Sequence, residues 1–585
     1  MAEILSAQYK SVFTTPKNTP PSLPPKDITQ VLNDIDIIVD DMSNALKSIS
    51  AWAAPGPDGV SAYFLKTFAD TLAPALCLLW KMSLDSGIMP DDVNLAFITP
   101  IFKGGDKSEP ANYRPVALTN HITKAFEKIV KQEILFHLCA HNFLNNTQHG
   151  FTSGRSTLTN LIEYYESILL LLEHHQYVDS IYLDYSKAFD KCDHDIILHK
   201  LDNLGIRGKL NTWISGFLKR RQQIVVVQGA KSSPVWCISG VPQGSVLGPL
   251  LFLILMLDIT SSIIHSILSS FADDTKIWKG ISNEEAQRML QADLDRVYIW
   301  AEQNNMTFNS KKFQAIRFAE LLSHAVYNSD LGVPMEESEL VKDLGVYIAS
   351  NLHFDQHIRT IANKGKRVAG WITRVFSTRD PGVMLTLLKQ LVYPTVEYNS
   401  VLWNPSDSDL IEALENIQRN FTRKIESDKL PPNHDYWDRL QHFKLYSMQR
   451  RRERYSIFYV WKVIHEHYPN PGLHLNTTTS DHTAHPNKGI QLNAHQRRGF
   501  APQHTANPPK WLENCSPLKS CCDLYNCLPA RLRQPIPADE EPSFDKFKKE
   551  VDEWLSKIPD QPTCSSRPKV AVSNSIIHQL QHRVR

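Results

Sequence analysis

The sequence contains no hydrophobic run long enough to cross a membrane and no basic-then-apolar signal pattern at its N-terminus. Its best apolar run, from Leu250 to Leu257, stops at Asp258, whereas a spanning helix needs roughly 20 apolar residues. We therefore expect an intracellular, soluble protein of the nucleus and cytoplasm with no membrane partner.

The sequence also has few cysteines and nearly equal numbers of positive and negative charges. The nine cysteines include one close group (Cys515, Cys521, Cys522 and Cys527) that has no CxxC pair and no matching pair of histidines, so it does not predict a zinc site. The net charge is only +1, so only local basic surfaces could bind nucleic acid. Basic runs such as Lys219–Arg221 and 450–452 are, taken alone, more often solvated helix faces.

The composition itself is that of a folded, globular chain, with 42% apolar and 21% charged residues over 585 positions. Periodicity predicts helices within 35–49, 61–88, 122–138, 158–173, 284–303, 385–396 and 411–425. It predicts strands within 95–102, 180–183, 224–227, 235–238, 270–278 and 344–348, and a loop over 469–510. In 61–88 we expect one shared face, formed by Phe64, Leu65, Phe68, Leu72 and Leu76.

Two segments place carboxylates at the ends of apolar strands. One is Ile181-Tyr-Leu-Asp184, and the other is Ser270-Phe-Ala-Asp273-Asp274 followed by a second strand. An Asp-Asp pair is by itself more often an ordinary turn, but the strands on both sides favour a site. Converging carboxylates would repel each other unless a hard divalent cation joined them, and Mg²⁺ prefers such oxygen ligands.

These segments, with the decapeptide Gly240-Val-Pro-Gln-Gly-Ser-Val-Leu-Gly-Pro249, carry a resemblance to a known family. FADDTK, DYSKAFDKCDH and GVPQGSVLGP resemble, in order and spacing, the central motifs of non-LTR retrotransposon reverse transcriptases of the jockey-like, LINE-type group. The resemblance extends from about Phe13 to about Leu555. It implies an α+β, right-hand polymerase fold with fingers, a palm with an antiparallel sheet, a helical thumb and a mostly helical C-terminal region.

The resemblance also implies roles for single residues. Asp184, Asp273 and Asp274 would be catalytic and would hold two Mg²⁺ ions, with Mn²⁺ as the alternative, for nucleotidyl transfer. Lys312 would protonate or neutralise the leaving pyrophosphate, although its neighbour Lys311 leaves that choice open.

The incoming dNTP would contact a second set of residues. Lys103 and Arg114 would neutralise its triphosphate. Phe189 would lie under the deoxyribose and exclude a 2′-hydroxyl, although by residue type alone a core aromatic is the commoner reading. Gln243 and Gly244 would approach the nucleotide through a tight turn.

A third set would contact template and primer. Arg155 would bind a backbone phosphate, with helix capping by Ser156 or Thr157 as an equal reading of that segment. Leu344 and Gly345 would belong to a primer-grip hairpin, and Leu344 is more simply explained as structural.

The expected organisation is an N-terminal linker and helix over 1–50, fingers and palm over 51–348, a thumb-like helical region over 349–430, and a C-terminal region of unclear role over 431–585. The expected function is an RNA-directed DNA polymerase that extends a primer 3′-hydroxyl with dNTPs on an RNA template during target-primed reverse transcription. Its partners would be the RNA template and the DNA primer or target. The family's N-terminal endonuclease is not found in the sequence, so we expect nicking activity to be supplied elsewhere.

Two rival interpretations remain from the sequence. The first is a catalytically decayed or domesticated nucleic-acid-binding copy of the same fold, which the three aspartates argue against. The second is an RNA-dependent RNA polymerase, which Phe189 opposes because a smaller or polar residue would be needed to admit a ribose.

Overall fold

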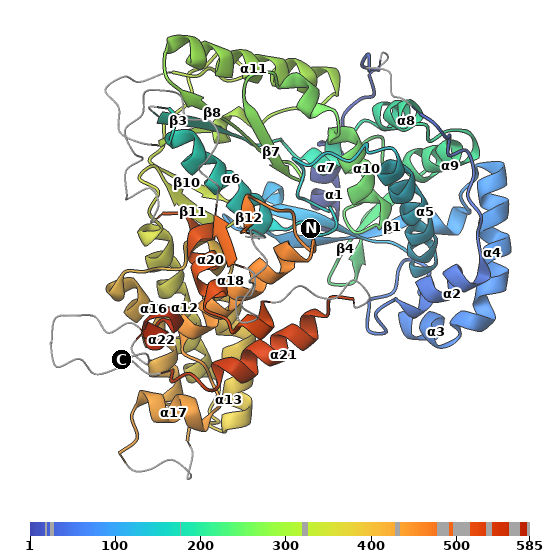
Figure 1. Ribbon diagram of the computed structural model, residues 1–585. Coiled ribbons are helices and arrows are strands. Elements are labelled where there is room, and N and C mark those ends of the chain that lie inside the picture. The colour runs from blue at the N-terminus through green and yellow to red at the C-terminus, as the bar shows by residue number, and fades with distance from the viewer. Residues whose placement is uncertain are drawn as a thin grey trace, which may run out of the picture.

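The computed structural model describes residues 1–17, 20–23, 28–175, 177–318, 326–426, 433–476, 491–494, 515–533, 541–560 and 574–581. It combines β-sheets with many helices, and this confirms the α+β class (Figure 1). The division into fingers, palm and thumb stays a prediction. Among the described residues, no helix is both long and apolar enough to span a bilayer.

The central feature is a four-stranded antiparallel sheet with the strand order β7-β8-β3-β9. Its strands are β3 (Tyr177–Leu183), β7 (Ile267–Phe271), β8 (Asp274–Ile281) and β9 (Gln314–Phe318). Both faces are covered, because α6 (Thr157–Leu172) packs on one face and α11 (Glu284–Gln303) on the other. Strand β3 is therefore almost continuously buried and does not alternate between apolar and polar residues.

A second sheet has the order β2-β1-β4-β5, with β6 also paired to β4. Its strands are β1 (Leu95–Phe102), β2 (Tyr113–Leu118), β4 (Gln222–Val227), β5 (Ala230–Lys231) and β6 (Val235–Trp236). β1 and β2 form an antiparallel hairpin in which Ile101 lies opposite Arg114. Helix α1 (Ala2–Lys10) packs on this sheet through Leu5 and Tyr9.

Helices of the N-terminal half form a core around three aromatic rings. Trp80 stacks on Phe126 with ring centroids 4.7 Å apart, and the edge of Trp213 meets both rings. The helices are α2 (Val39–Lys47), α3 (Ala62–Thr67), α4 (Ala69–Ser86), α5 (His121–Ala140), α7 (Ala188–Lys191), α8 (His194–Asn203), α9 (Gly208–Lys219) and α10 (Leu247–Met256).

The buried face predicted for 61–88 is wrong in part. Phe64 and Phe68 are 46% and 48% exposed, while α4 buries Ala69, Ala73 and Trp80. The predicted residues do not share one face because the chain breaks at Phe68 into α3 and α4, and α4 is oriented by Trp80, which packs against Phe126 of α5 and Trp213 of α9.

A helical region follows the hairpin formed by β10 (Leu340–Asp343) and β11 (Val346–Ala349). Its helices are α12 (Asp355–Val375), α13 (Pro381–Leu387), the π-helical segment η5 (Leu388–Val392), α14 (Tyr393–Glu397), α15 (Ser400–Trp403), α16 (Ser408–Thr422), α17 (Tyr436–His442) and α18 (Met448–Ile464). Further along the chain lie β12 (Leu473–Asn476), β13 (Gln491–Ala494), α20 (Pro517–Asn526), α21 (Phe544–Leu555) and α22 (Ile576–Gln581). Short 3-10 turns are η1 (Asp91–Val93), η2 (Pro110–Asn112), η3 (Ile259–Ser262), η4 (Ser310–Lys312) and η6 (Ala530–Leu532).

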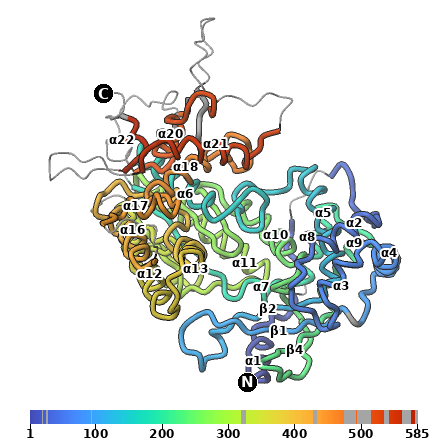
Figure 2. The backbone as a smooth tube through the Cα atoms, turned by 90° about the horizontal axis from the view of Figure 1, so that it is seen from below, coloured from blue at the N-terminus to red at the C-terminus, as the bar shows by residue number. Residues whose placement is uncertain are grey.

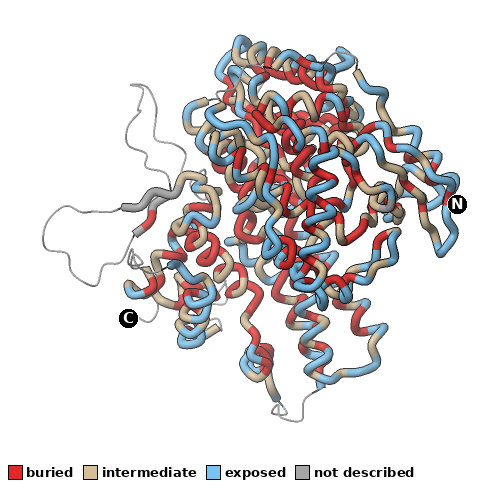
Figure 3. The backbone as a smooth tube through the Cα atoms, turned by 90° about the vertical axis from the view of Figure 1, so that its right-hand side faces the viewer, coloured by how far each residue is buried: buried red, intermediate tan, exposed pale blue. Residues whose placement is uncertain are grey.

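Figures 2 and 3 show how this region meets the rest of the molecule. In Figure 2 helices α18 and α20 lie beside α6, and their buried side chains belong to one core with those of α6, while Figure 3 shows buried residues running through the interior of the molecule. Two predictions need correction here. The strand expected at 344–348 begins only at Val346, because Leu344 and Gly345 form the hairpin turn with φ of 44° and 88°. The loop expected over 469–510 contains the paired strands β12 and β13, and the rest of it lies largely outside the described residues.

Candidate active site

Three aspartates meet at one end of the four-stranded sheet. Asp184 directly follows β3, and β3 pairs with β8 so that Leu183 lies opposite Thr275. One step further along this antiparallel register, Asp184 lies beside Asp274. Asp273 occupies the two-residue turn between β7 and β8, where Phe271 pairs with Asp274 and Ala272 adopts a φ of 56°. The register therefore brings together carboxylates that are about ninety positions apart in the sequence.

The carboxylates of this cluster interact with one another, although Asp184 and Asp273 are only half-buried and Asp274 is exposed. Burial raises the pKa of Asp273 above its ordinary value, and the neighbouring charge of Asp184 raises it further. The pKa of Asp274 rises to about 6, first through burial and then through Asp273, Asp343 and Asp184. A cation between these side chains would relieve both effects.

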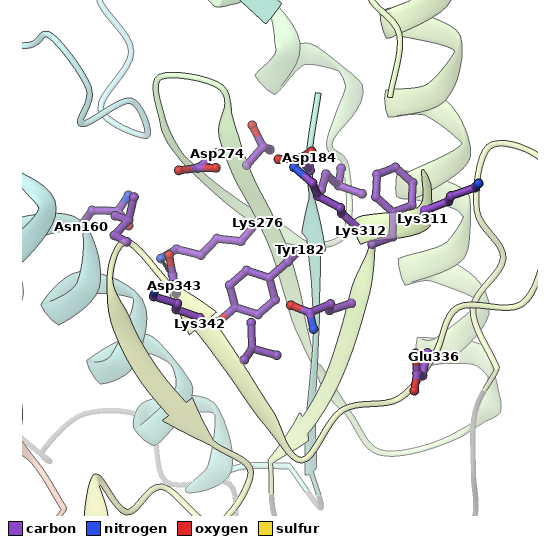
Figure 4. A pocket seen from close by; sticks show the side chains of 16 residues that line it. Asn160, Tyr182, Asp184, Asp274, Lys276, Lys311, Lys312, Glu336, Lys342 and Asp343 are labelled. Atoms are coloured by element: carbon purple, nitrogen blue, oxygen red, sulfur yellow. Dashed lines mark hydrogen bonds and ion pairs between the residues drawn. The ribbon is translucent and has the colours of Figure 1, made fainter. Parts of the chain in front are cut away.

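Lys312 supplies one positive charge at the cluster. Its Nζ lies 2.9 Å from Oδ2 of Asp184. Figure 4 shows Lys312 directed toward Asp184, whereas the Lys311 ammonium points away from Asp184. The two adjacent lysines are therefore not equivalent in this structure, and Lys312 is the one in contact with the carboxylates.

The carboxylate oxygens of the three aspartates are the candidate ligands for a metal ion. Within the described ranges, no group of three His, Cys, Asp or Glu side chains has the arrangement of a formed metal site. The chemistry still fits, because the aspartates supply only hard oxygen donors and Lys312 already neutralises one of them. Divalent metal ions suit this cluster once Lys312 shifts off Asp184.

A cavity of about 410 Å³ opens beside the aspartates, between the sheet and the β10–β11 hairpin. Asp184, Asp274 and Leu344 line it. Beneath them, Lys276 and Asp343 form a buried ion pair with Nζ and Oδ2 2.5 Å apart. This pair fastens the hairpin to β8, the strand that begins at Asp274. This ion pair was not predicted from the sequence, because 67 positions separate the two residues.

The β1–β2 hairpin brings two predicted cations to the same place. Burial lowers the pKa of Lys103, and the positive charges of Arg114, Lys187 and Lys312 lower it further. Arg114 and Lys103 in turn stabilise the ionised form of Asp273. The set includes Lys187, which sequence reasoning missed although it lies within the DYSKAFD motif. A positively charged surface thus faces the aspartates.

Phe189 lies between two aromatic rings. It stacks on Phe252 with centroids 4.5 Å apart, and it meets the edge of Phe151 at 5.8 Å. The Val241 N–H donates to the Phe189 carbonyl at 2.8 Å. These contacts fix the ring, which remains only half-buried and so can still meet a ligand.

The Pro-Gln-Gly turn is held by specific bonds. Gln243 donates from Nε2 to Oδ1 of Asp190 at 3.0 Å, and its carbonyl accepts the Ala117 N–H at 2.8 Å. A Cβ at Gly244 would lie 2.2 Å from the Ala117 carbonyl, and the residue has a φ of 137°. The close approach that needs glycine here is therefore to strand β2. Substrate contact by Gln243 and Gly244 stays a prediction.

Arg155 makes its hydrogen bonds within the chain. Its guanidinium donates to the carbonyl and side chain of Asn146 and contacts His149. Capping of α6 falls to Ser156, which forms a capping box with Thr159. Capping therefore comes from a neighbour of Arg155, and a phosphate contact by the arginine stays a prediction.

Leu344 and Gly345 sit at the tip of the hairpin beside Tyr398. The Tyr398 hydroxyl donates to the Leu344 carbonyl at 3.0 Å. A Cβ at Gly345 would lie 3.2 Å from the Tyr398 ring, so glycine permits this contact. Their predicted role at the primer remains to be tested.

Comparison with known proteins agrees with this geometry. Residues 103–348 match the family model described as reverse transcriptase (RNA-dependent DNA polymerase). The chain is 28% identical over 383 residues to a probable RNA-directed DNA polymerase from transposon X-element of Drosophila melanogaster, covering 64% of this chain and 42% of that protein. It is 26% identical over 404 residues to the RNA-directed DNA polymerase from mobile element jockey of the same species, covering 66% and 44%. The chain thus spans less than half the length of these curated relatives. On the motifs, the sheet that joins them and these matches, residues 103–348 form a reverse transcriptase domain, and the chain is similar to the RNA-directed DNA polymerases of jockey-like non-LTR retrotransposons.

Proposed function

We propose that this chain extends a primer 3′-hydroxyl with dNTPs on an RNA template, using two Mg²⁺ ions held by Asp184, Asp273 and Asp274. The observation that carries the proposal is the register of β3 against β8, which puts Asp184 beside the Asp273–Asp274 turn. Bound ions would supply Lewis-acid activation of the attacking and leaving oxygens. The raised pKa values of Asp273 and Asp274 support this, since carboxylates that raise each other's pKa favour a cation between them.

The surrounding cations fit the remaining steps. Lys103 and Arg114 on the β1–β2 hairpin would hold a triphosphate against the aspartates, and their charge acting on Asp273 supports this. Lys312 is paired with Asp184. It can stabilise negative charge that develops on the leaving pyrophosphate only after a metal ion or the substrate has displaced it from Asp184. Lys187 adds a fourth positive charge to this surface.

Sugar selection would rest on Phe189. Its ring packs against Phe252 and Phe151, and these contacts hinder its displacement by a ribose 2′-hydroxyl. A fixed ring discriminates better than a mobile one, because rejection then costs a steric clash and not a rotamer change. We expect deoxynucleotides to be preferred for this reason.

Primer extension on an RNA template with dNTPs and Mg²⁺ tests the proposal. Wild-type protein should extend the primer. Asp273→Ala should reduce extension by at least ~10³-fold, because loss of a ligand removes several kcal/mol and each ~1.4 kcal/mol is tenfold in rate. The variant should still bind RNA. Equal extension by the variant and wild type would remove the aspartates from the mechanism.

The same assay separates the rivals. A decayed or domesticated copy would bind the template without extending it, and an RNA polymerase would use NTPs in place of dNTPs. Priming from a nicked DNA target is the proposed cellular setting. It is tested by offering a pre-nicked duplex in place of an annealed primer.

A further inference from the structure

A second cavity, of about 640 Å³, lies in the helical region, and all its lining residues except Leu158 fall outside the matched range 103–348. Its lining comes mainly from the segment η5 to α15, helix α18 and helix α21. Nothing in the proposed catalytic mechanism uses this groove.

The groove is positively charged. It is lined by one carboxylate, Glu397, and by five cations: Lys389, Arg451, Arg454, Lys462 and Lys548. Arg451 forms a bidentate pair with Glu397, and Arg454 forms one with Asp552, so neither arginine contributes free charge. Lys389 and Lys548 are exposed, and within the described part of the chain neither forms an ion pair. The groove therefore carries free positive charge, as a phosphate-binding surface needs.

Aromatic rings alternate with these cations. Tyr398 is 43% exposed, and Tyr455, Tyr468 and Phe544 are half-buried in the same wall. The Lys462 ammonium lies 5.0 Å from the Tyr468 ring centroid and 4.6 Å from that of Phe544. Accessible aromatic faces beside basic side chains are the combination that binds unpaired bases and their backbone together.

One hydrogen bond and one helix connect the lining of the groove with that of the catalytic cavity. Tyr398 lines the groove and donates to the carbonyl of Leu344, which lines the catalytic cavity. Helix α6 contributes Leu158 to the groove and Asn160 to the catalytic cavity. A strand that passes the hairpin turn would enter the groove directly.

We propose that this groove binds single-stranded nucleic acid as it passes to or from the catalytic cavity. The exposed lysines contact backbone phosphates and the half-buried rings stack on bases. A duplex is excluded, because its bases are already stacked on each other and cannot reach the rings in the groove wall. Binding here requires neither metal nor dNTP, so it can be measured apart from polymerase activity.

The test is fluorescence anisotropy of labelled 20-nucleotide RNA and DNA strands with the full chain in EDTA at about 0.1 M salt. Lys389→Ala with Lys548→Ala should weaken binding about 25-fold, because each phosphate contact to a single strand contributes ~0.7 to the salt slope and two are lost. The slope itself should fall by about 1.4. Tyr468→Leu should weaken binding about tenfold through lost stacking. Lys389→Arg with Lys548→Arg should retain wild-type affinity.

A matched control lies on the same helix. Lys546 and Lys549 of α21 are exposed but do not line the groove, so their double alanine variant should lose less than about threefold. Equal losses in the groove and control variants would overturn the proposal, as would an unchanged affinity in the groove variant or duplex binding that depends equally on Lys389 and Lys548. A stronger effect on RNA assigns the groove to the template, and a stronger effect on DNA assigns it to the product or target strand. If the groove variant loses binding while Asp273→Ala keeps it, the groove and the catalytic proposal are tested independently.

Discussion

Replacing Lys276 by methionine is expected to loosen the β10–β11 hairpin from the sheet that carries the aspartates. The Lys276 ammonium and the Asp343 carboxylate are 2.5 Å apart, and their side chains are only 4% and 6% exposed. The lysine also lies 4.2 Å from the centre of the Tyr164 ring. Methionine preserves most of the side-chain volume but leaves Asp343 buried without its charge partner.

The magnitude follows from the geometry. At 2.5 Å and an effective dielectric constant of about 20, two unit charges attract by roughly 7 kcal/mol. Desolvation of both ions offsets much of this, so the net value of the intact pair is small. Removing one partner is different, because it leaves an uncompensated buried charge at a cost of about 3–5 kcal/mol.

Hydrogen exchange followed by mass spectrometry measures the local loss of stability in the β10–β11 hairpin. Amides of β10 and β11 should exchange roughly a hundred- to several thousand-fold faster in the variant, up to the limit set by the hairpin's own opening energy. Exchange in α4, which is remote from the pair, should not change. A global unfolding curve is less suitable, because a chain of this size does not unfold in two states.

Two controls define the outcome. Arg288→Ala removes an exposed i,i+4 partner of Glu284 and should cost less than about 0.5 kcal/mol. Lys276→Met combined with Asp343→Leu removes both charges and should restore exchange to near wild type. The reasoning is refuted if Lys276→Met behaves like Arg288→Ala, or if the double variant exchanges faster than either single variant.

Three further predictions concern the site and its support. Phe189→Val should admit ribonucleotides in primer extension, raising NTP use at least about tenfold relative to dNTP use; unchanged selectivity would exclude the ring from the sugar site. Lys312→Ala should slow extension roughly 10²-fold in single-turnover assays, while Lys311→Ala, which loses no contact with Asp184, should stay within about threefold; equal effects would contradict the assignment. Glu127 is fully buried on α5 and accepts the Val246 and Leu247 N–H groups at the start of α10, and burial raises its pKa from 4.5 to about 7. Because the folded protein holds this proton more tightly, stability present below pH 4.5 is lost as pH rises through 7, by about 3 kcal/mol. Glu127→Gln should therefore melt at a higher temperature than wild type at pH 8.5 but not at pH 4.5, and parallel pH profiles would refute this.

Local sequence patterns determined much of the secondary structure and the chemical character of the site. The helix at Glu284–Gln303 and the strand at Leu95–Phe102 were predicted from periodicity and have these bounds in the structure. The position of Asp184 at a strand end and the Asp273–Asp274 turn were also predicted from the sequence, because apolar strands and turns are recognised from residues within a few positions of one another.

The tertiary structure decided what local patterns cannot encode. The face that α4 buries depends on where Trp80 meets Phe126 and Trp213, and Phe64 is left exposed. Leu344 and Gly345 look like strand residues until the pairing of β10 with β11 makes them a turn.

The Lys276–Asp343 pair and the basic, aromatic groove join side chains that lie far apart in the chain. Such partners are chosen by long-range packing and charge compensation, which act only after the chain has folded. The sequence therefore determined which residues could do the chemistry, and the fold decided which of them meet.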